Sequence, residues 1–202
     1  MTRPLLDTDL DPNPFDQFAK WFEEAMSAQP DLPEGVTVST ATADGVVSSR
    51  VCLMKSFDRR GFVFFTNYHS RKGEQLHANP MAAFCWWWPA LQRQVRAEGV
   101  IVKTTAEESD AYWVTRPRAS QLGAWASEQS KVILGRGDLE GRCRELKETY
   151  RGIDVPRPPH WGGFRLIPNL VEFWQGRTDR MHDRFVYRLR ESNDWVIERL
   201  SP

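Results

Sequence analysis

Apolar residues recur at helical spacing near the start of the chain. Phe15, Phe18, Phe22 and Met26 lie three or four positions apart, which predicts an amphipathic helix over residues 14–28 that packs by its phenylalanine face. Further capped or amphipathic patterns predict helices over 70–78, 105–115, 119–127 and 138–150. The first 14 residues show little periodicity and several Asp and Pro residues, so we expect a flexible or loosely docked arm over 1–14.

Segments rich in β-branched and aromatic residues alternate with turn signals. Asp44-Gly45 is typical of a hairpin turn between strands over 36–42 and 46–57. More strands are expected over 62–67, 81–88, 92–103, 163–174, 185–190 and 195–200. The helices interrupt the strand series instead of alternating with it, so we expect an α+β fold on an antiparallel barrel of six or seven strands, as one domain over 15–202.

Composition narrows the class of partner. The 202 residues include 27 Lys+Arg and 27 Asp+Glu, so the formal net charge is zero. Nothing global draws such a chain to nucleic acid or to an anionic membrane, and a bound anion needs a local cluster of cations. No G-x-G-x-x-G or Walker A motif is present, so we expect side chains to bind any phosphate.

The cysteines and the N-terminus indicate a compartment. Cys52, Cys85 and Cys143 are odd in number and far apart, with no C-x-x-C spacing or histidine pair that would suggest a zinc site, so we expect no metal. The N-terminal residues lack the apolar run of a signal peptide, and no stretch approaches the length of a membrane span. We therefore expect a cytoplasmic protein.

Cations in and after the second predicted strand are candidate anion ligands. Arg50 and Lys55 are five positions apart and should face opposite sides of a strand, which suits two different anions, although solvated strand charges explain them on local grounds. Ser70-Arg71-Lys72 opens a predicted helix, where free N–H groups attract anions; an ordinary capped surface helix is the alternative.

Aromatic and polar residues elsewhere suit ring binding. The three tryptophans 86–88 cannot all face one side of a strand, so at least one should meet another subunit or a ring system, with packing the preferred role over direct ligand stacking. Tyr112, Arg116 and Ser120 recur every four residues and can converge only if the chain turns at Pro117. A helix end with a C-terminal arginine explains them equally well.

The stretch from residue 172 to 184 is the most informative. It holds three arginines, 177, 180 and 184, and a histidine at the position expected for a turn between two strands. If Arg180 and His182 share one face, they can hold a substrate and manage its proton while Trp174 and Arg184 face a cofactor. No hydrolase triad order or H-E-x-x-H pattern offers an alternative.

Taken in order, these motifs resemble the pyridoxine/pyridoxamine 5′-phosphate oxidase family. The resemblance runs from about Pro14 to Pro202 through RVCLMK, FFTNYHSRKGEQL, RQVRAEG, YWVTRPRASQLGAWASEQS, HWGGFRL and EFWQGRTDRMHDR. It implies an FMN-binding split β-barrel with peripheral helices, working as a homodimer with FMN at the subunit interface.

The resemblance also implies two sets of site residues. The positions that match the family's FMN site are Arg50, Val51, Cys52, Leu53, Met54, Lys55, Phe65, Thr66, Arg71, Lys72, Gln94, Gln129, Ser130, Trp174 and Arg184. The positions that match its substrate site are Lys55, Tyr112, Arg116, Ser120, Arg180 and His182, with Arg180 and His182 in the catalytic role. We also note departures: the N-terminal arm is short, and the acidic position before the first strand is shifted to Asp31 and Glu34.

The implied reaction is oxidation of pyridoxine or pyridoxamine 5′-phosphate, a small phosphorylated pyridine, to pyridoxal 5′-phosphate. Dioxygen is the acceptor, and hydrogen peroxide is released, with ammonia when the substrate is the amine. Two alternatives stay open. One is an FMN oxidase of the same fold acting on another substrate, such as a phenazine precursor; the other is a flavin or pyridoxal-phosphate carrier without turnover.

Overall fold

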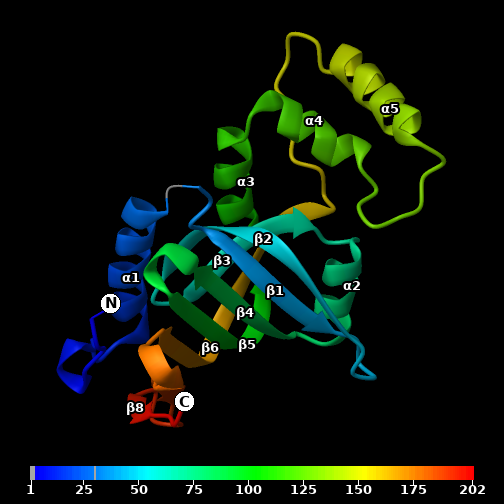
Figure 1. The fold of residues 1–202 in the computed structure, drawn as a ribbon. Helices are drawn as coiled ribbons and strands as arrows, with labels where there is room; N and C mark the ends of the chain where they lie inside the picture. Colours follow the sequence, from blue (N-terminus) through cyan, green and yellow to red (C-terminus); the bar gives the residue numbers. More distant parts are fainter. Residues whose placement is uncertain (1–2, 30) are drawn as a thin grey trace.

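The computed structural model describes residues 3–29 and 31–202 (Figure 1). These residues form one antiparallel sheet in the order β3-β2-β1-β4-β5-β6-β7-β8, and β3 also pairs with β6. The strands are β1 Gly35–Ala41, β2 Val47–Asp58, β3 Gly61–Asn67, β4 Met81–Trp88, β5 Arg93–Lys103, β6 Trp161–Gln175, β7 Asp183–Leu189 and β8 Trp195–Arg199. The β3–β6 pairing closes a six-stranded barrel, which confirms the expected antiparallel barrel.

The sheet has as many strands as the ranges expected from the sequence, and six of them form the barrel. The described residues contain eight strands, because β7 and β8 continue the sheet beyond the barrel. The strand β6 makes this extension: its first half pairs with β3, and its second half pairs with β7. One long strand therefore belongs both to the barrel and to the C-terminal hairpin.

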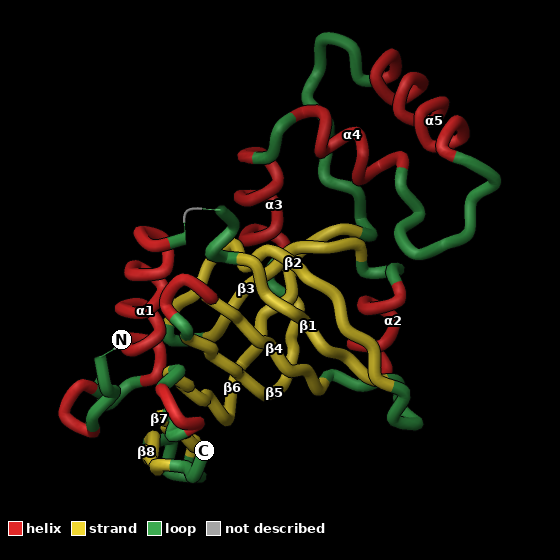
Figure 2. Tube along the Cα trace, viewed as in Figure 1, coloured by secondary structure: helices red, strands yellow, loops and turns green. Residues whose placement is uncertain are grey.

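Helices lie around the barrel (Figure 2). They are α1 Pro14–Ala28, α2 Arg71–Ala78, α3 Ala106–Thr115, α4 Arg118–Ala126 and α5 Arg136–Thr149. Figure 2 shows α1 and α2 on opposite sides of the barrel, whereas α4 and α5 project beyond it. The expected helix ranges are confirmed to within about two residues; α5 begins at Arg136 and not at Asp138 as expected.

The helix α1 begins where its sequence requires. The Asn13 side chain accepts a hydrogen bond from the Phe15 N–H at 2.9 Å, and Pro14 takes the first helical position, where no N–H is needed. Phe18 is fully buried against the rings of Phe57, Phe62 and Trp86. The phenylalanine face therefore packs on the barrel core as predicted.

The buried face of α1 differs from the expected one at Met26. Met26 is 47% exposed, whereas Trp21 and Ala25 are buried. A helix of 3.6 residues per turn that buries Phe18 continues through Trp21 and Ala25, which turns Met26 outward.

The tryptophan triplet alternates as a strand requires. Trp86 and Trp88 are buried in the core, while Trp87 is 49% exposed on the outer face of β4. The outer indole lies beside the ring of Trp174, with centroids 5.9 Å apart. Trp87 is therefore the outward-facing tryptophan of the three, and its contact with another subunit or a ligand ring stays a prediction.

The residues before α1 contact the C-terminal hairpin. Leu5 is buried, and its N–H donates to the Asp183 carboxylate at 3.1 Å. The Tyr187 hydroxyl donates to the Asp11 carbonyl at 2.8 Å. Within the described ranges, no helix combines the length and the apolar character needed to cross a membrane.

Candidate functional site

A buried lysine lies near the N-terminal end of α2. Lys72 is only 8% exposed, and its Nζ donates to Thr66 Oγ1 at 3.1 Å and to Gln129 Oε1 at 3.3 Å. Burial lowers the pKa of Lys72, because the ammonium has lost water and gained only neutral partners. Ser70 caps the helix by accepting from the Gly73 N–H at 3.3 Å.

Two arginines complete a group that we call the α2 cation cluster, namely Arg50, Arg71 and Lys72. The Arg50 guanidinium donates to Val38 O, Thr40 Oγ1 and Ser48 Oγ at 2.7–3.1 Å. Burial lowers the pKa of Arg50, and the nearby Arg71 lowers it further. Among the described residues, no carboxylate lies within ion-pair distance of the cluster. Its unbalanced charge fits a phosphate monoester.

The strand β2 divides its residues between two faces. Cys52 and Met54 lie on the same face as Arg50, and burial raises the pKa of the Cys52 thiol. Val51 is 71% exposed on the other face, which Leu53 and Lys55 share. The strand is irregular between Met54 and Ser56, and the position of Lys55 away from Arg50 is shown by the hollow that Lys55 lines with Phe65.

Lys55 lines an aromatic hollow of about 490 Å³ together with Phe65 and Tyr112. The rings of Phe65 and Tyr112 stack with centroids 4.1 Å apart, and the ring of Trp161 lies nearly parallel to both, 5.4 Å from Phe65 and 6.1 Å from Tyr112. The Lys55 Nζ lies 3.8 Å from the Glu34 carboxylate. Trp161 was missed by the sequence analysis, because only the β3–β6 pairing, which is non-local, brings it here.

Arg116 lies beside this hollow with an unused donor. Its guanidinium carbon is 4.5 Å from the centroid of Trp161 and 5.1 Å from that of Trp113, and Nη1 is buried without a hydrogen-bond partner. Burial lowers the pKa of Arg116. A buried guanidinium N–H that lacks an acceptor is well suited to bind an anionic ligand.

The chain turns between α3 and α4, as the convergence of Tyr112, Arg116 and Ser120 requires. The helix α3 ends at Thr115, and Arg116 is extended, as is usual for a residue before proline. Ser120 lies in the first turn of α4, where its N–H donates to the Pro117 carbonyl at 2.8 Å. Tyr112 and Arg116 are neighbours because they lie four residues apart at the end of α3, while the Ser120 hydroxyl makes no hydrogen bond to them within the described part of the chain.

The segment after α4 returns to the α2 cation cluster. Gln129 accepts from Thr66 Oγ1 at 3.1 Å, and the next residue, Ser130, has a φ of +74°, in the left-handed region. Such a backbone conformation is costly for a residue other than glycine and is common at binding sites.

A second set of residues forms a row across four strands. Trp87 pairs with Gln94, Gln94 with Trp174, and Trp174 with Arg184. Directly opposed residues share a face, so these four side chains lie side by side on the outer face of the sheet. The row presents two indoles, an amide and a guanidinium, which suits a planar polar ring.

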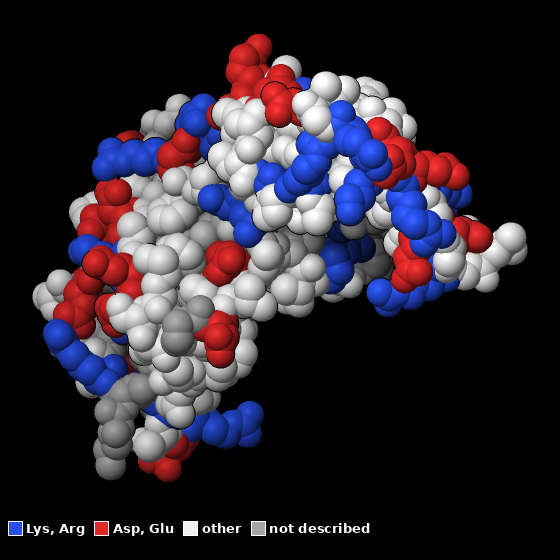
Figure 3. Space-filling view, turned by 90° about the horizontal axis from the view of Figure 1, so that it is seen from above, with Lys and Arg blue, Asp and Glu red and all other residues white. Residues whose placement is uncertain are grey.

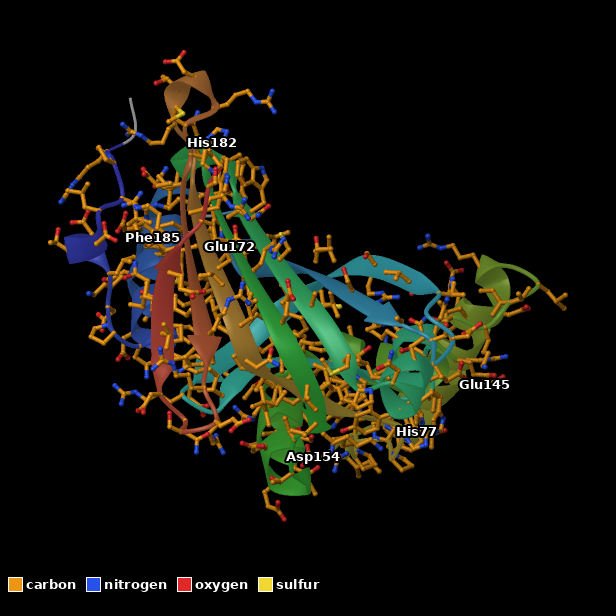
Figure 4. The ribbon with its side chains drawn as sticks, turned by 90° about the horizontal axis from the view of Figure 1, so that it is seen from below. His77, Glu145, Asp154, Glu172, His182 and Phe185 are labelled. Atoms are coloured by element: carbon orange, nitrogen blue, oxygen red, sulfur yellow. The ribbon has the colours of Figure 1, made fainter. Side chains whose placement is uncertain are left out.

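His182 lies at the end of this row. Its imidazole is 4.6 Å from the Trp174 ring, between centroids, and Nδ1 accepts from the Arg177 backbone N–H at 3.1 Å. Figure 4 shows His182 at one end of the sheet, with Glu172 further along it. Arg180 is exposed, and both Asp179 and Arg180 have left-handed φ values, +56° and +62°. The turn that presents Arg180 is thus held in an uncommon backbone conformation.

Glu172 lies next to the row, on the same face of β6 as Trp174. It is 3% exposed, and its carboxylate accepts from Arg184 Nε at 2.8 Å and lies 3.3 Å from Arg96 Nη2. The hydrogen bond to Glu172 raises the pKa of Arg184. The sequence analysis gave Glu172 no role, because a glutamate in a strand is usually a solvent-facing residue.

Some members of the two sets are far apart along one chain. Phe65 pairs with Gly163 near the start of β6, whereas Trp174 lies eleven residues further along that strand. At roughly 3.3 Å per residue, that is about 35 Å of strand. Figures 1 and 4 show α2 on one side of the molecule and the C-terminal hairpin with β8 on the other. The predicted site residues therefore form two half-sites.

The face of the molecule seen from above carries side chains of both charges (Figure 3). Figure 3 shows basic and acidic side chains intermixed over the face seen from above. In the described part of the chain, no group of three or more His, Cys, Asp or Glu side chains could hold a metal ion. The half-sites are thus the places where the geometry favours an anionic, aromatic ligand.

Comparisons with known proteins agree with these features. Residues 22–150 match the family model described as pyridoxamine 5′-phosphate oxidase, and residues 161–202 match the one described as the pyridoxine 5′-phosphate oxidase C-terminal dimerisation region. The chain belongs to the pyridoxine/pyridoxamine 5′-phosphate oxidase family. It is therefore an oxidoreductase, as its resemblance implied.

Individual relatives support this assignment. The chain is 54% identical over 98% of its length to a pyridoxine/pyridoxamine 5′-phosphate oxidase of Gloeothece citriformis, of which it covers 92%. A protein of the same name from Paraburkholderia phymatum is 56% identical over 96% of the chain and 92% of the relative. Among solved structures, PhzG of Burkholderia lata in complex with tetrahydrophenazine-1-carboxylic acid is 33% identical, with a TM-score of 0.92 over 100% of this chain and 99% of that one.

Proposed function

We propose that the protein is an FMN-dependent oxidase that converts pyridoxine 5′-phosphate or pyridoxamine 5′-phosphate to pyridoxal 5′-phosphate. Dioxygen accepts the electrons and leaves as hydrogen peroxide; the amine substrate also consumes water and releases ammonia. FMN, when bound, would supply the hydride-accepting ring and its reoxidation by dioxygen. The observation that carries the proposal is the pair of half-sites. Each offers cationic side chains and aromatic rings that suit part of a flavin or its substrate.

Separate cations support two phosphate groups. The α2 cation cluster would hold the FMN phosphate, because its charges have no carboxylate partner among the described residues. Arg116, with its unused Nη1, would bind the substrate phosphate beside Lys55 and Ser120. Tyr112 would cover one face of the pyridine ring, since it lines the hollow that Lys55 also lines.

The row on the outer sheet face would receive the flavin ring and the reacting carbon of the substrate. Gln94, Trp174 and Arg184 present their polar and aromatic groups side by side. His182, at the end of the row, would hold the polar group at C4′, and Arg180 would steer that carbon over the flavin. Both residues would act by orientation and by proton placement at the substrate.

A homodimer would unite the half-sites. One flavin cannot contact residues that lie about 35 Å apart along β6, so we propose that each site takes one half from either chain. The outer sheet face also carries exposed apolar side chains, with Val47 67%, Val51 71% and Trp87 49% exposed. Covering such a patch with a second copy removes it from water.

The unpaired Cys52, Cys85 and Cys143 support a reducing, cytoplasmic location.

The test is to load the purified protein with FMN, add pyridoxine 5′-phosphate in air, and follow pyridoxal 5′-phosphate and hydrogen peroxide together. We expect the two products in equal amounts. An FMN-loaded protein that forms neither product would overturn the proposal and favour a carrier. The phosphate-free alcohol pyridoxine is the matched substrate control, and it should be oxidised far less well.

A second candidate is oxidation of a phenazine precursor. It is favoured by the TM-score of 0.92 to PhzG in complex with tetrahydrophenazine-1-carboxylic acid. Arg116 argues against it, because its buried free donor suits a phosphate ester. Parallel assays with both substrate classes at equal concentration distinguish the two.

A further inference from the structure

A buried carboxylate lies beside the row of side chains on the outer sheet face, and no step of the proposed reaction uses it. The Glu172 side chain is 4% exposed, although it is on the sheet face that carries Trp174 and Arg184. Burying a carboxylate is costly unless it is paired, and here two arginines pair with it: Arg184 from β7 and Arg96 from β5. Figure 4 shows Glu172 in the body of the sheet and away from the exposed turn.

The contacts leave Arg184 with one open edge. Its Nε donates to Glu172 Oε1 at 2.8 Å, and its Nη1 donates to the Ser201 carbonyl at 3.0 Å. Two of the three guanidinium nitrogens are thus committed to the chain, and Nη2 makes no hydrogen bond to the described residues. A guanidinium is planar, so holding it at two nitrogens fixes the direction of the third.

We infer that Glu172 is a positioning residue for the flavin. It orients Arg184 toward the flavin ring and offsets the positive charge of Arg184 and Arg96. The inference rests on the proposed FMN site and names a residue that the resemblance did not assign. Without the carboxylate, only the Ser201 carbonyl would hold the Arg184 guanidinium, and the site would carry one more positive charge. The first change weakens FMN binding, and the second stabilises reduced, more negative flavin.

The experiment compares Glu172→Gln with a matched control on the same face. Glu98→Gln removes a carboxylate that lies 3.0 Å from Arg96 but is 44% exposed and does not contact Arg184. Apoprotein is titrated with FMN by flavin fluorescence, the flavin midpoint potential is measured, and thermal unfolding of each apoprotein reports folding. We expect E172Q to raise the FMN Kd about tenfold or more and to make the potential more positive. E98Q should match the unaltered protein.

Two further variants isolate the mechanism. Glu172→Asp keeps the charge but shortens the reach, so it should weaken FMN binding while leaving the potential near its original value; it also carries the test if E172Q does not fold. In an Arg184→Gln background, E172Q should add little to the loss of FMN affinity, because the residue it positions is gone. A folded E172Q or E172D protein with unaltered Kd, or equal losses in E98Q and E172Q, would overturn the inference. Failure of the unaltered protein to bind FMN would instead overturn the proposed function.

Discussion

The backbone N–H of Arg177 donates to Nδ1 of His182 at 3.1 Å. Because Nδ1 acts as an acceptor there, the neutral imidazole carries its proton on Nε2. The Trp174 ring, 4.6 Å away between centroids, limits how far the imidazole can rotate. His182 therefore presents one defined donor toward the proposed C4′ position.

Substitution of His182 should reveal this donor. We expect His182→Ala to lower kcat by about a hundredfold, near the low end of the range for a positioned proton-transferring group. His182→Asn can still accept from the Arg177 N–H through its amide oxygen, so it should retain more activity than the alanine variant. Steady-state kinetics with pyridoxine 5′-phosphate measure both, and equal activity in the two variants would argue against a fixed donor.

The buried charge of Lys72 should make apoprotein stability depend on pH. Its pKa in the folded chain is below the ordinary value, 10.5, so between the two pKa values the unfolded chain binds more protons. Stability therefore rises with pH through that alkaline window, by about 1.4 kcal/mol for each unit of pKa difference. Lys72→Met should remove this increment and weaken FMN binding. Urea unfolding at several pH values from 7 to 10 measures the free energy of unfolding against pH. The same dependence on pH in the variant as in the unaltered protein would contradict the assignment.

Arg116 should act on the substrate phosphate. We expect Arg116→Gln to raise KM for pyridoxine 5′-phosphate by about tenfold to a hundredfold with a smaller change in kcat, because the loss falls on ground-state binding. Arg118→Gln is the control: that guanidinium donates to the backbone carbonyls of Tyr150 and Ile153 and should not affect KM. Inhibition by inorganic phosphate should weaken in R116Q alone.

The exposed outer face should matter for assembly. Val51→Asp places a charge on the proposed subunit interface, so we expect a shift from dimer to monomer and a loss of FMN together. Val132→Asp is the matched control, because Val132 is 99% exposed in the segment before α5. Light scattering after gel filtration measures the mass, and a V51D dimer would exclude this face as the interface.

Much of the fold was predictable from residues that are close together in the sequence. The Asp44-Gly45 turn and the alternation along β1 and β2 lead to the hairpin that the structure contains. Asn13 and Pro14 define the start of α1 in the same way. Such features depend on neighbours in the sequence, so a single chain reveals them.

The resemblance named the site residues one by one, and those assignments stay predictions; their arrangement in space was not predictable. The expected opposite faces of Arg50 and Lys55 came from strand geometry, and the resemblance named the other ligands. The division into half-sites depends on the length of β6 and on its pairing with β3, which are long-range features. Trp161 and Glu172 were missed for that reason: their neighbours come from distant strands.

The long strand β6 has a consequence for unfolding. It carries backbone hydrogen bonds to β5 along most of its length, to β3 at one end and to β7 at the other. Neither the barrel nor the C-terminal hairpin can open without loosening the same strand. The amide protons of β6 should therefore be among the slowest to exchange with solvent, released only when the whole molecule unfolds as one cooperative unit.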